Sequence, residues 1–327
     1  MKLNLLSGIQ PSGKLHIGNY LGALKNFVEL QNSDRYQCFF FIADLHSLTE
    51  EFDPLDKKQQ TINLLADYLA AGLNPKKSLL YVQSQISAHS ELAWILNTIA
   101  PFGEMSRMTQ FKDKSEIQKE NVNVGLFTYP TLMAADIILY DTHFVPVGED
   151  QRQHLELTRL LARKFNSRFG KTFIEPQPLL TKTPRVMSLS DPYKKMSKSQ
   201  PDGCLFIDDP PEEIERKIMS AVTDSEKEVR YHPETKAGIS NLLEIFSGLS
   251  GEEIPQLEQK FSGKNYGQFK KALVKLVSKY FSSFRRRKEK LLSNPERLIK
   301  IALRGSKVAH KIAQEKMTLV KTEIGLL

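Results

Sequence analysis

Two short segments far apart in the chain carry residues that could bind the phosphates of a nucleotide. The first, Gly8-Ile9-Gln10-Pro11-Ser12-Gly13-Lys14, matches the GxxxxGK start of a P-loop. A P-loop needs Ser or Thr next, to hold magnesium, but Leu15 follows here. Pro11 also lacks the backbone N–H that such a loop directs at a phosphate. The sequence therefore argues against a P-loop.

The residues that follow offer a different way to hold a nucleotide. His16-Ile17-Gly18-Asn19 stands at the expected start of a helix, where free backbone N–H groups and the helix dipole favour a phosphate. His16 and Asn19 can donate hydrogen bonds to phosphate oxygens. Gly18 has no side chain to keep an adenine ring away from the backbone. The alternative is a structural histidine beside a glycine.

The second segment is Lys195-Met196-Ser197-Lys198-Ser199, in a polar stretch between Ser188 and Gly203. Two lysines three residues apart on a loop of small residues can both reach a triphosphate. Their compact, rotatable ammonium groups suit the charge that develops on a leaving pyrophosphate. The alternative is a solvated linker.

A single acid interrupts an apolar helix face between residues 127 and 141. Tyr129, Met133 and Asp136 lie at i, i+4 and i+7, so they share that face. A carboxylate there costs free energy unless a partner hydrogen-bonds it. Asp136 is expected either to accept a ligand's polar hydrogen, or to be partly exposed or satisfied by an arginine.

The elements that must position these residues change character near residue 190. Up to that point strand and helix patterns alternate, which indicates an α/β fold with a doubly wound parallel sheet. Only helical patterns follow, so we expect one domain over 1–190 and a second, all-helical domain over 191–327, with the boundary in Ser188–Gly203. The expected strands are 3–6, 36–44, 78–83 and 144–147, and the expected helices are 61–73, 90–99, 127–141, 151–165, 211–225, 239–249, 251–262, 264–292 and 294–320.

Charge is concentrated at one end of the 327-residue chain. The net charge is +8, but residues 261–327 hold 17 Lys and Arg against 4 Asp and Glu. The rest holds 29 basic against 34 acidic side chains. A basic end on a mildly acidic body indicates a polyanionic partner such as nucleic acid. The alternative is a solvated, lysine-rich helix face.

Composition excludes several other classes. With 40% hydrophobic and 26% charged residues, wholesale disorder is excluded. No apolar stretch approaches the ~18 residues that span a bilayer, and no secretory signal is recognisable. Cys38 and Cys204 lack the spacing of metal ligands and argue for a reduced compartment. We expect a cytoplasmic protein with no membrane partner and no metal site of its own.

Together the two phosphate-binding segments resemble the paired signature of class I aminoacyl-tRNA synthetases, GxxPSGxxHIGN near the start and KMSKS about 180 residues later. The chain resembles the bacterial-type tryptophanyl-tRNA synthetases, close to their full length. The first signature ends in Asn19 rather than His, which is usual in the tryptophan and tyrosine branch. The matching stretches are 7–24, 43–46, 108–112, 129–140, 145–154, 187–199 and 221–225.

The resemblance implies a HIGH-type Rossmann nucleotide-binding domain and a C-terminal all-helical domain for tRNA and its anticodon, whose last helix packs back on the first. The implied catalytic groups are Lys195, Lys198, Gln10 and His16. The implied ATP contacts are Gln10, Pro11, Ser12, Gly18, Asn19, Gly148, Glu149, Asp150, Val186, Lys195, Met196, Ser197, Lys198 and Ser199. The implied tryptophan contacts are Leu6, His46, Tyr129, Met133, Asp136, Val145, Val147 and Gln151, with Asp136 accepting the indole N–H and Leu6 at a wall position that is aromatic in some relatives.

The implied reaction is the ligation of tryptophan to tRNA(Trp) through tryptophanyl-adenylate, by a homodimer that uses ATP with its bound Mg²⁺. Three alternatives stand beside it. A tyrosyl-tRNA synthetase could use the same aspartate for a phenol O–H, although Gly148–Gln151 and the Met133/Asp136 helix favour tryptophan. A small-molecule nucleotidyltransferase of the same fold would not need the basic end. An RNA-binding module without catalysis would not need the lysine loop.

Overall fold

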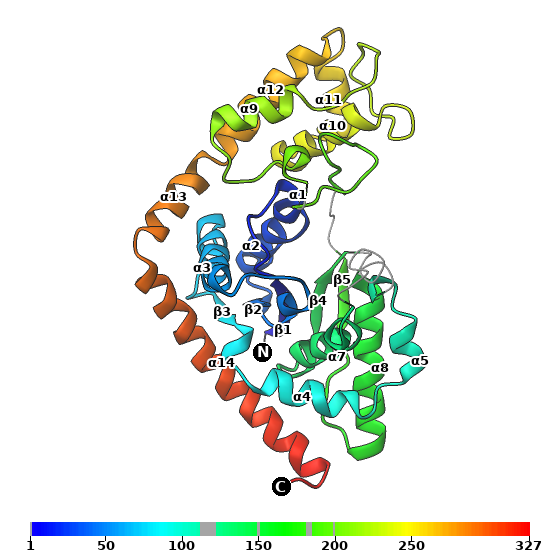
Figure 1. Ribbon diagram of the computed structural model, residues 1–327, viewed down its shortest axis with the longest axis vertical. Coiled ribbons are helices and arrows are strands. Elements are labelled where there is room, and N and C mark those ends of the chain that lie inside the picture. The colour runs from blue at the N-terminus through cyan, green and yellow to red at the C-terminus, as the bar shows by residue number, and fades with distance from the viewer. Residues whose placement is uncertain (1, 112–121, 149–150, 181–184, 199) are drawn as a thin grey trace.

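Five parallel strands form the centre of the molecule (Figure 1). The computed structural model describes residues 2–111, 122–148, 151–180, 185–198 and 200–327. The strands are β1 (Leu3–Ile9), β2 (Tyr36–Ile42), β3 (Ser78–Val82), β4 (Phe144–Val147) and β5 (Gln177–Leu180), in the spatial order β3-β2-β1-β4-β5. The sequence predicted all but β5. This edge strand contains Pro178 and has no fully buried residue, so it lacks the apolar pattern that marks a strand.

Strand β2 shows that the sheet is covered on both faces. Phe40 belongs to one apolar core, where Phe27 of α2 (Lys25–Asn32) stacks on it at 4.5 Å between ring centroids and α3 (Pro54–Ala71) adds Tyr68. Its neighbours Phe39 and Phe41 belong to a second core with α4 (Ala88–Asn97), α7 (Val124–Ile138) and α8 (Arg152–Phe169). Alternate residues of a strand point to opposite faces, so the predicted doubly wound sheet is confirmed.

The strand order identifies where this sheet can bind a ligand. From β1 the sheet grows to β2 and β3 on one side and to β4 and β5 on the other. In open parallel sheets, ligands bind outside the carboxyl ends of the strands at such a switch point. The residues that follow Ile9 and Val147 therefore lie where a ligand is expected.

The named elements after residue 190 are all helical in the described part of the chain. The helices are η5 (Pro201–Gly203), α9 (Pro211–Met219), α10 (Ala237–Ser250), α11 (Ile254–Lys260), α12 (Tyr266–Tyr280), α13 (Ser282–Leu292) and α14 (Pro295–Glu323). The prediction of one helix over 264–292 is wrong, because the chain divides at Phe281. Phe281 is buried and packs edge to face on Tyr20, with ring centroids 5.0 Å apart. The predicted helix over 211–225 is also too long, since α9 ends at Met219.

Helix α14 runs back along the edge strand β3 (Figure 1). Gly305 faces the Leu80 carbonyl so closely that a Cβ would overlap its oxygen. The neighbouring Ser306 Oγ accepts a hydrogen bond from the Val82 N–H at 3.2 Å. The helix therefore both covers this edge of the sheet and satisfies one of its backbone donors.

Two further features bear on the predictions from composition. Among the described residues, no helix combines the length and apolar character needed to cross a membrane. Cys38 and Cys204 are buried free thiols, and burial raises the pKa of Cys38 to about 11 and of Cys204 to about 12. Both thiols are therefore protonated and unreactive at neutral pH.

Candidate active site

The first candidate segment follows the carboxyl end of β1, which the Tyr68 hydroxyl holds by hydrogen bonds. The Tyr68 hydroxyl accepts the Ile9 N–H at 3.1 Å and donates to the Phe41 carbonyl at 3.0 Å. The turn then closes on itself, with the Ser12 N–H donating to the Gln10 carbonyl at 2.9 Å. The turn thus holds the Gln10 and Ser12 side chains at the carboxyl edge of the sheet.

His16 and Asn19 cap the helix that begins after this turn, which consists of α1 (Ile17–Asn19), η1 (Tyr20–Leu24) and α2. The His16 N–H donates to Asn19 Oδ1 at 3.2 Å, and the Asn19 N–H donates to His16 Nδ1 at 3.2 Å. Ile17 donates its N–H to the Leu205 carbonyl at 2.8 Å. The prediction of free backbone amides is therefore wrong for Ile17 and Asn19. Since His16 Nδ1 accepts, its ring proton is on Nε2, which can donate to a ligand.

Gly18 lies against two residues that the sequence assigned to the same nucleotide. A Cβ at Gly18 would come within 2.9 Å of the His16 ring and 3.4 Å of the Val186 Cβ. His16, Gly18 and Val186 are thus one packed group, and only glycine fits its middle position.

Backbone hydrogen bonds join this group to the segments on both sides of the lysine loop. Beyond the loop, the Ile207 N–H donates to the Leu15 carbonyl at 3.1 Å, and His16 pairs with Phe206 in an antiparallel bridge. Before it, the Met196 N–H donates to the Val186 carbonyl at 3.1 Å, and the Met196 side chain is buried. The loop is therefore anchored at both ends next to His16.

Lys198 connects the lysine loop to the β1 turn. Its Nζ donates to Ser12 Oγ at 3.3 Å and to the Gly13 carbonyl at 3.4 Å. Burial lowers the pKa of Lys198, an effect that the Asp67 charge partly offsets. Burial, together with the charges of Lys198 and Lys195, lowers the pKa of His16 to about 4. The two segments predicted to bind phosphate therefore meet, and a neutral imidazole lies in the field of two ammonium groups.

Asp136 is buried and hydrogen-bonded by three side chains. Its Oδ2 accepts from His46 Nε2 at 2.7 Å, and its Oδ1 accepts from His89 Nδ1 at 2.6 Å. Gln83 Nε2 donates to Oδ1 at 2.7 Å and to Oδ2 at 2.9 Å. Burial raises the pKa of Asp136, but the hydrogen bonds from His46 and His89 outweigh it, so this pKa lies below its ordinary value. Asp136 is neither exposed nor paired with an arginine, so both of those alternatives are wrong.

Tyr129 and the apolar side chains predicted to surround tryptophan lie around the same helix. The His46 and Tyr129 rings meet edge to face at 6.1 Å, and His154 Nε2 donates to the Tyr129 hydroxyl at 2.7 Å. The remaining predicted wall residues share one apolar core: Leu6 of β1, Val145 and Val147 of β4, and Met133 packed against them. His46 thus lies beside both the Asp136 carboxylate and the Tyr129 ring, and the predicted apolar wall residues belong to the core on this face of the sheet.

The segment after β4 lies at the same edge of the sheet. Gln151 precedes α8, and its N–H donates to the Gly148 carbonyl at 3.1 Å. Glu149 and Asp150, predicted to bind ATP, lie outside the described residues, as does Ser199 of the lysine loop. Gly148 and Gln151 follow β4, which is paired with β1.

Sequence reasoning missed three residues of the Asp136 site. Gln83 follows β3, His89 lies in α4, and Tyr140 follows α7 with its hydroxyl 2.8 Å from His89 Nε2. A polar residue directly after a buried strand, as Gln83 is, was the available signal. His89 and Tyr140 could not be linked to Asp136 by spacing, because the contacts depend on how α4 packs against α7.

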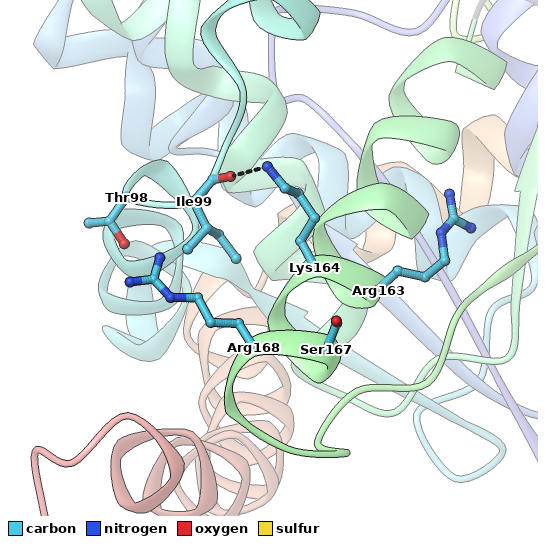
Figure 2. A pocket seen from close by; sticks show the side chains of 6 residues that line it. All are labelled: Thr98, Ile99, Arg163, Lys164, Ser167 and Arg168. Carbon is cyan, nitrogen blue, oxygen red and sulfur yellow. Dashed lines mark hydrogen bonds between the residues drawn. The ribbon is translucent and has the colours of Figure 1, made fainter.

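A separate surface pocket of about 500 Å³ lies beside the C-terminal half of α8 (Figure 2). Lys164 extends across it and donates to the Ile99 carbonyl at 3.3 Å. The pocket is lined by Thr98, Ile99, Arg163, Lys164, Ser167 and Arg168. None of these residues belongs to the predicted site.

The chain is similar over its whole length to known proteins, in sequence and in structure. A tryptophan–tRNA ligase from Caldanaerobacter subterraneus subsp. tengcongensis is 52% identical over 326 residues, 99% of this chain and 98% of that protein. The crystal structure of tryptophanyl-tRNA synthetase from Mycoplasma pneumoniae has a TM-score of 0.90 at 39% identity, over 100% of this chain and 99% of that one. The Campylobacter jejuni tryptophanyl-tRNA synthetase, complexed with ADP and tryptophan, has a TM-score of 0.84 at 37% identity, over 99% and 100%.

The sequence model of the family described as tRNA synthetases class I (W and Y) matches residues 1–282. That match includes the five strands, the β1 turn, the lysine loop and Asp136. It agrees with the doubly wound sheet and with the meeting of the two predicted phosphate-binding segments. The chain belongs to the class I aminoacyl-tRNA synthetases, in the family that serves tryptophan and tyrosine.

Proposed function

We propose that this chain is a tryptophan–tRNA ligase that activates L-tryptophan with Mg·ATP and transfers it to tRNA(Trp). The observation that carries the proposal is the contact of Lys198 with Ser12 and Gly13, which joins the two phosphate-binding segments at the switch point of the sheet. Relatives at 37% to 52% identity that are named for tryptophan favour it over tyrosine.

In the proposed first step, the tryptophan carboxylate attacks the α-phosphorus of ATP. A carboxyl O–P bond forms, the bond to the bridging oxygen of the β-phosphate breaks, and pyrophosphate leaves with its electron pair. The terminal ribose hydroxyl of the tRNA then displaces AMP from the acyl carbon. No side-chain nucleophile is required, so catalysis rests on positioning and electrostatic stabilisation.

Lys195 and Lys198 would stabilise the charge that develops on the leaving pyrophosphate, with Gln10 and His16 as hydrogen-bond donors. Two observations support these roles. His16 is neutral with its proton on Nε2, so it can donate. Within the described residues, the hydrogen bonds of Lys198 Nζ are long, at 3.3 and 3.4 Å, so this ammonium can turn to a phosphate.

The remaining ATP contacts would divide between adenine, ribose and phosphates. Adenine would lie beside Val186 and against the backbone of Gly18, which has no side chain to keep the ring away and lies next to Val186. Pro11, Ser12 and Asn19 would line the phosphates together with Met196, Ser197 and Ser199. Gly148, Glu149 and Asp150 would hold the ribose, as acidic side chains at strand ends often do.

Magnesium would arrive on the ATP phosphates and offset part of their charge. Two oxygen atoms accept hydrogen bonds from Lys198 Nζ, the Ser12 hydroxyl and the Gly13 carbonyl. In the described part of the chain, no group of three His, Cys, Asp or Glu side chains is arranged to hold a metal ion. A cation carried by the nucleotide would then lie beside these two oxygens.

The tryptophan ring would lie against Leu6, Met133, Val145 and Val147, with His46 and Tyr129 at its edges and its N–H on Asp136. Gln151 would face the amino group of the substrate. The support is the buried Asp136 carboxylate among apolar and aromatic side chains. A buried carboxylate with a low pKa can accept an indole N–H in a charge-assisted hydrogen bond.

The basic end would bind the tRNA, in a helical domain over 191–327 that follows a catalytic domain over 1–190. Helix α13 and the longer α14 carry much of the positive charge of residues 261–327. We further propose a cytoplasmic homodimer. Trp94 of α4 and Phe102 of α5 (Phe102–Ser106) are 70% and 75% exposed, which fits an apolar interface near these helices.

Pyrophosphate exchange into ATP tests the proposed function. Exchange should depend on L-tryptophan and prefer it over L-tyrosine by ~10⁴ or more, as in sites that hydrogen-bond their substrate. Asp136→Asn should lose most of this preference. Asp141→Asn is the matched control, because Asp141 pairs with Lys316 at 2.7 Å on the surface. Exchange with tyrosine instead, or with neither amino acid, would overturn the proposal.

Binding of tRNA separates the synthetase from a nucleotidyltransferase that needs no RNA. Filter binding of tRNA(Trp) over a salt series should show affinity that falls steeply with salt, because phosphate contacts release counterions. The absence of binding at low salt would favour the nucleotidyltransferase.

A further inference from the structure

The Asp136 carboxylate has no unused acceptor position in this structure. A carboxylate offers about four lone-pair directions. Asp136 accepts from three side chains at 2.6 to 2.9 Å, with His46 on Oδ2, His89 on Oδ1, and Gln83 Nε2 shared between both oxygens, so each oxygen has two donor contacts. An incoming ring N–H must therefore replace one of these donors.

Exposure distinguishes the donor that can leave from those that cannot. Gln83 and His89 are 0% exposed and Asp136 is 1% exposed, whereas His46 is 6% exposed. His46 also meets the ring of Tyr129, a predicted wall of the substrate pocket. The carboxylate is thus approached from the side of His46, through Oδ2.

Tyr140 holds the ring nitrogen of His89 that does not contact Asp136. With its proton on Nδ1, His89 donates to Asp136 Oδ1 at 2.6 Å, and its Nε2 accepts from the Tyr140 hydroxyl at 2.8 Å. The rings of His89 and Tyr140 are also packed at 5.5 Å between centroids. Tyr140 therefore selects the tautomer of His89 that can donate to Asp136.

We infer that Gln83 and His89 are positioning residues that hold Asp136 for recognition of the indole N–H, which replaces His46 on Oδ2. This inference rests on the proposed function and deepens it. Asp136, Gln83 and His89 come from α7, η3 (Gln83–Gln85) and α4, so three separate elements fix the orientation of one carboxylate. Without His89, the carboxylate would be free to turn away from the ring N–H while the rest of the pocket remained.

The test measures indole N–H recognition by itself. The readout is the ratio of kcat/KM in pyrophosphate exchange for L-tryptophan and for β-(3-benzothienyl)-L-alanine, which has sulfur in place of the ring N–H. Loss of one charge-assisted hydrogen bond corresponds to a change of at least about tenfold. His89→Leu should lower the ratio at least about tenfold through KM, with kcat for tryptophan nearly unchanged. His89→Asn should keep most of the ratio, because its amide can replace Nδ1.

Two control variants show whether a change in the ratio is specific to the inner donors of Asp136. His46→Ala removes the donor that the ring N–H must replace, so it should raise KM for both amino acids without lowering the ratio, although His46 at 2.7 Å lies almost as close to Asp136 as His89 at 2.6 Å. Tyr68→Phe removes a buried hydroxyl with two hydrogen bonds on the opposite face of the sheet, and it should also leave the ratio unchanged. Equal losses of the ratio in His46→Ala and His89→Leu would overturn the inference.

Two further variants cover the case in which His89→Leu does not fold. Gln83→Met removes the other inner donor, and Tyr140→Phe removes the group that orients His89. Both should lower the ratio, and an unchanged ratio in both would overturn the inference. A wild-type chain without tryptophan-dependent exchange would overturn the proposed function itself. A high wild-type ratio that no variant changes would refute only the positioning roles.

Discussion

The substitution Lys198→Ala tests how the lysine loop contributes to catalysis. Among the residues that the structure describes, Lys198 Nζ donates to the Ser12 hydroxyl at 3.3 Å and to the Gly13 carbonyl at 3.4 Å. Both distances exceed the usual ~2.9–3.0 Å for N–H···O bonds, so both bonds are weak. Removing the ammonium should therefore change the free energy of unfolding by no more than ~0.5 kcal/mol.

The effect on the reaction should be much larger. Burial that lowers the pKa of Lys198 also weakens its hydration, so its charge acts strongly on a phosphate that comes into contact. The loss of one preorganised donor to a developing charge costs roughly 10²–10³ in rate, or about 2.7–4 kcal/mol. This loss should fall on kcat, with little change in the KM for tryptophan, because the charge it stabilises develops in the transition state.

The assay compares adenylate formation and thermal unfolding in wild type, Lys198→Ala and Lys194→Ala. Lys194 directly precedes the loop but is exposed and pairs with Asp191 at 3.0 Å, a surface ion pair that contributes little to stability. Its substitution should change kcat less than about threefold. Near-normal adenylate formation by a folded Lys198→Ala variant would refute the assigned role.

Three further predictions follow from other contacts. Gly18→Ala should raise the KM for ATP about tenfold, because its Cβ would displace the His16 ring, while Gly22→Ala, with nothing within 4 Å, should leave it unchanged. The pKa of His16 is about 4 in the folded chain and 6.5 in the unfolded chain. Between these two pH values the unfolded state binds more protons than the folded state. The free energy of unfolding should therefore fall as the pH drops from 6.5 towards 4. Urea unfolding at pH 7 and pH 5 checks this, and an equal pH dependence in His16→Gln would contradict it. Ser306→Ala leaves the buried Val82 N–H without its acceptor. The free energy of unfolding measured in urea should therefore fall by about 1–3 kcal/mol. A decrease below ~0.5 kcal/mol would show that this hydrogen bond does not stabilise the fold.

Much of the fold could be predicted because its strongest patterns are local. The run Tyr36–Ile42 is apolar on both faces, which is typical of a strand buried on both sides, and it forms β2, an inner strand between β3 and β1. The break at Phe281 could not be predicted, because no glycine or proline marks it. It depends on a contact with Tyr20, more than 250 residues away in the sequence.

The candidate site was predictable to a similar extent. The two segments predicted to bind phosphate stand out by their residue types, and the structure brings them together at Lys198 and Ser12. The surroundings of Asp136 were not, since Gln83 and His89 reach it from elements whose packing no spacing encodes. The free amides expected after His16 were wrong because Leu205 supplies an acceptor for Ile17 from beyond the lysine loop.

The way α14 meets β3 has a consequence for any attempt to shorten the protein. Strand β3 is an outer strand, and its Val82 leads directly into Gln83, which touches Asp136. A truncated chain without α14 would present a bare apolar strand to other molecules, and such strands recruit one another into aggregates. The C-terminal helix therefore supports the strand that leads to Gln83 and the proposed amino-acid pocket. A shorter fragment that stays in solution would need a substitute for Ser306 and its helix.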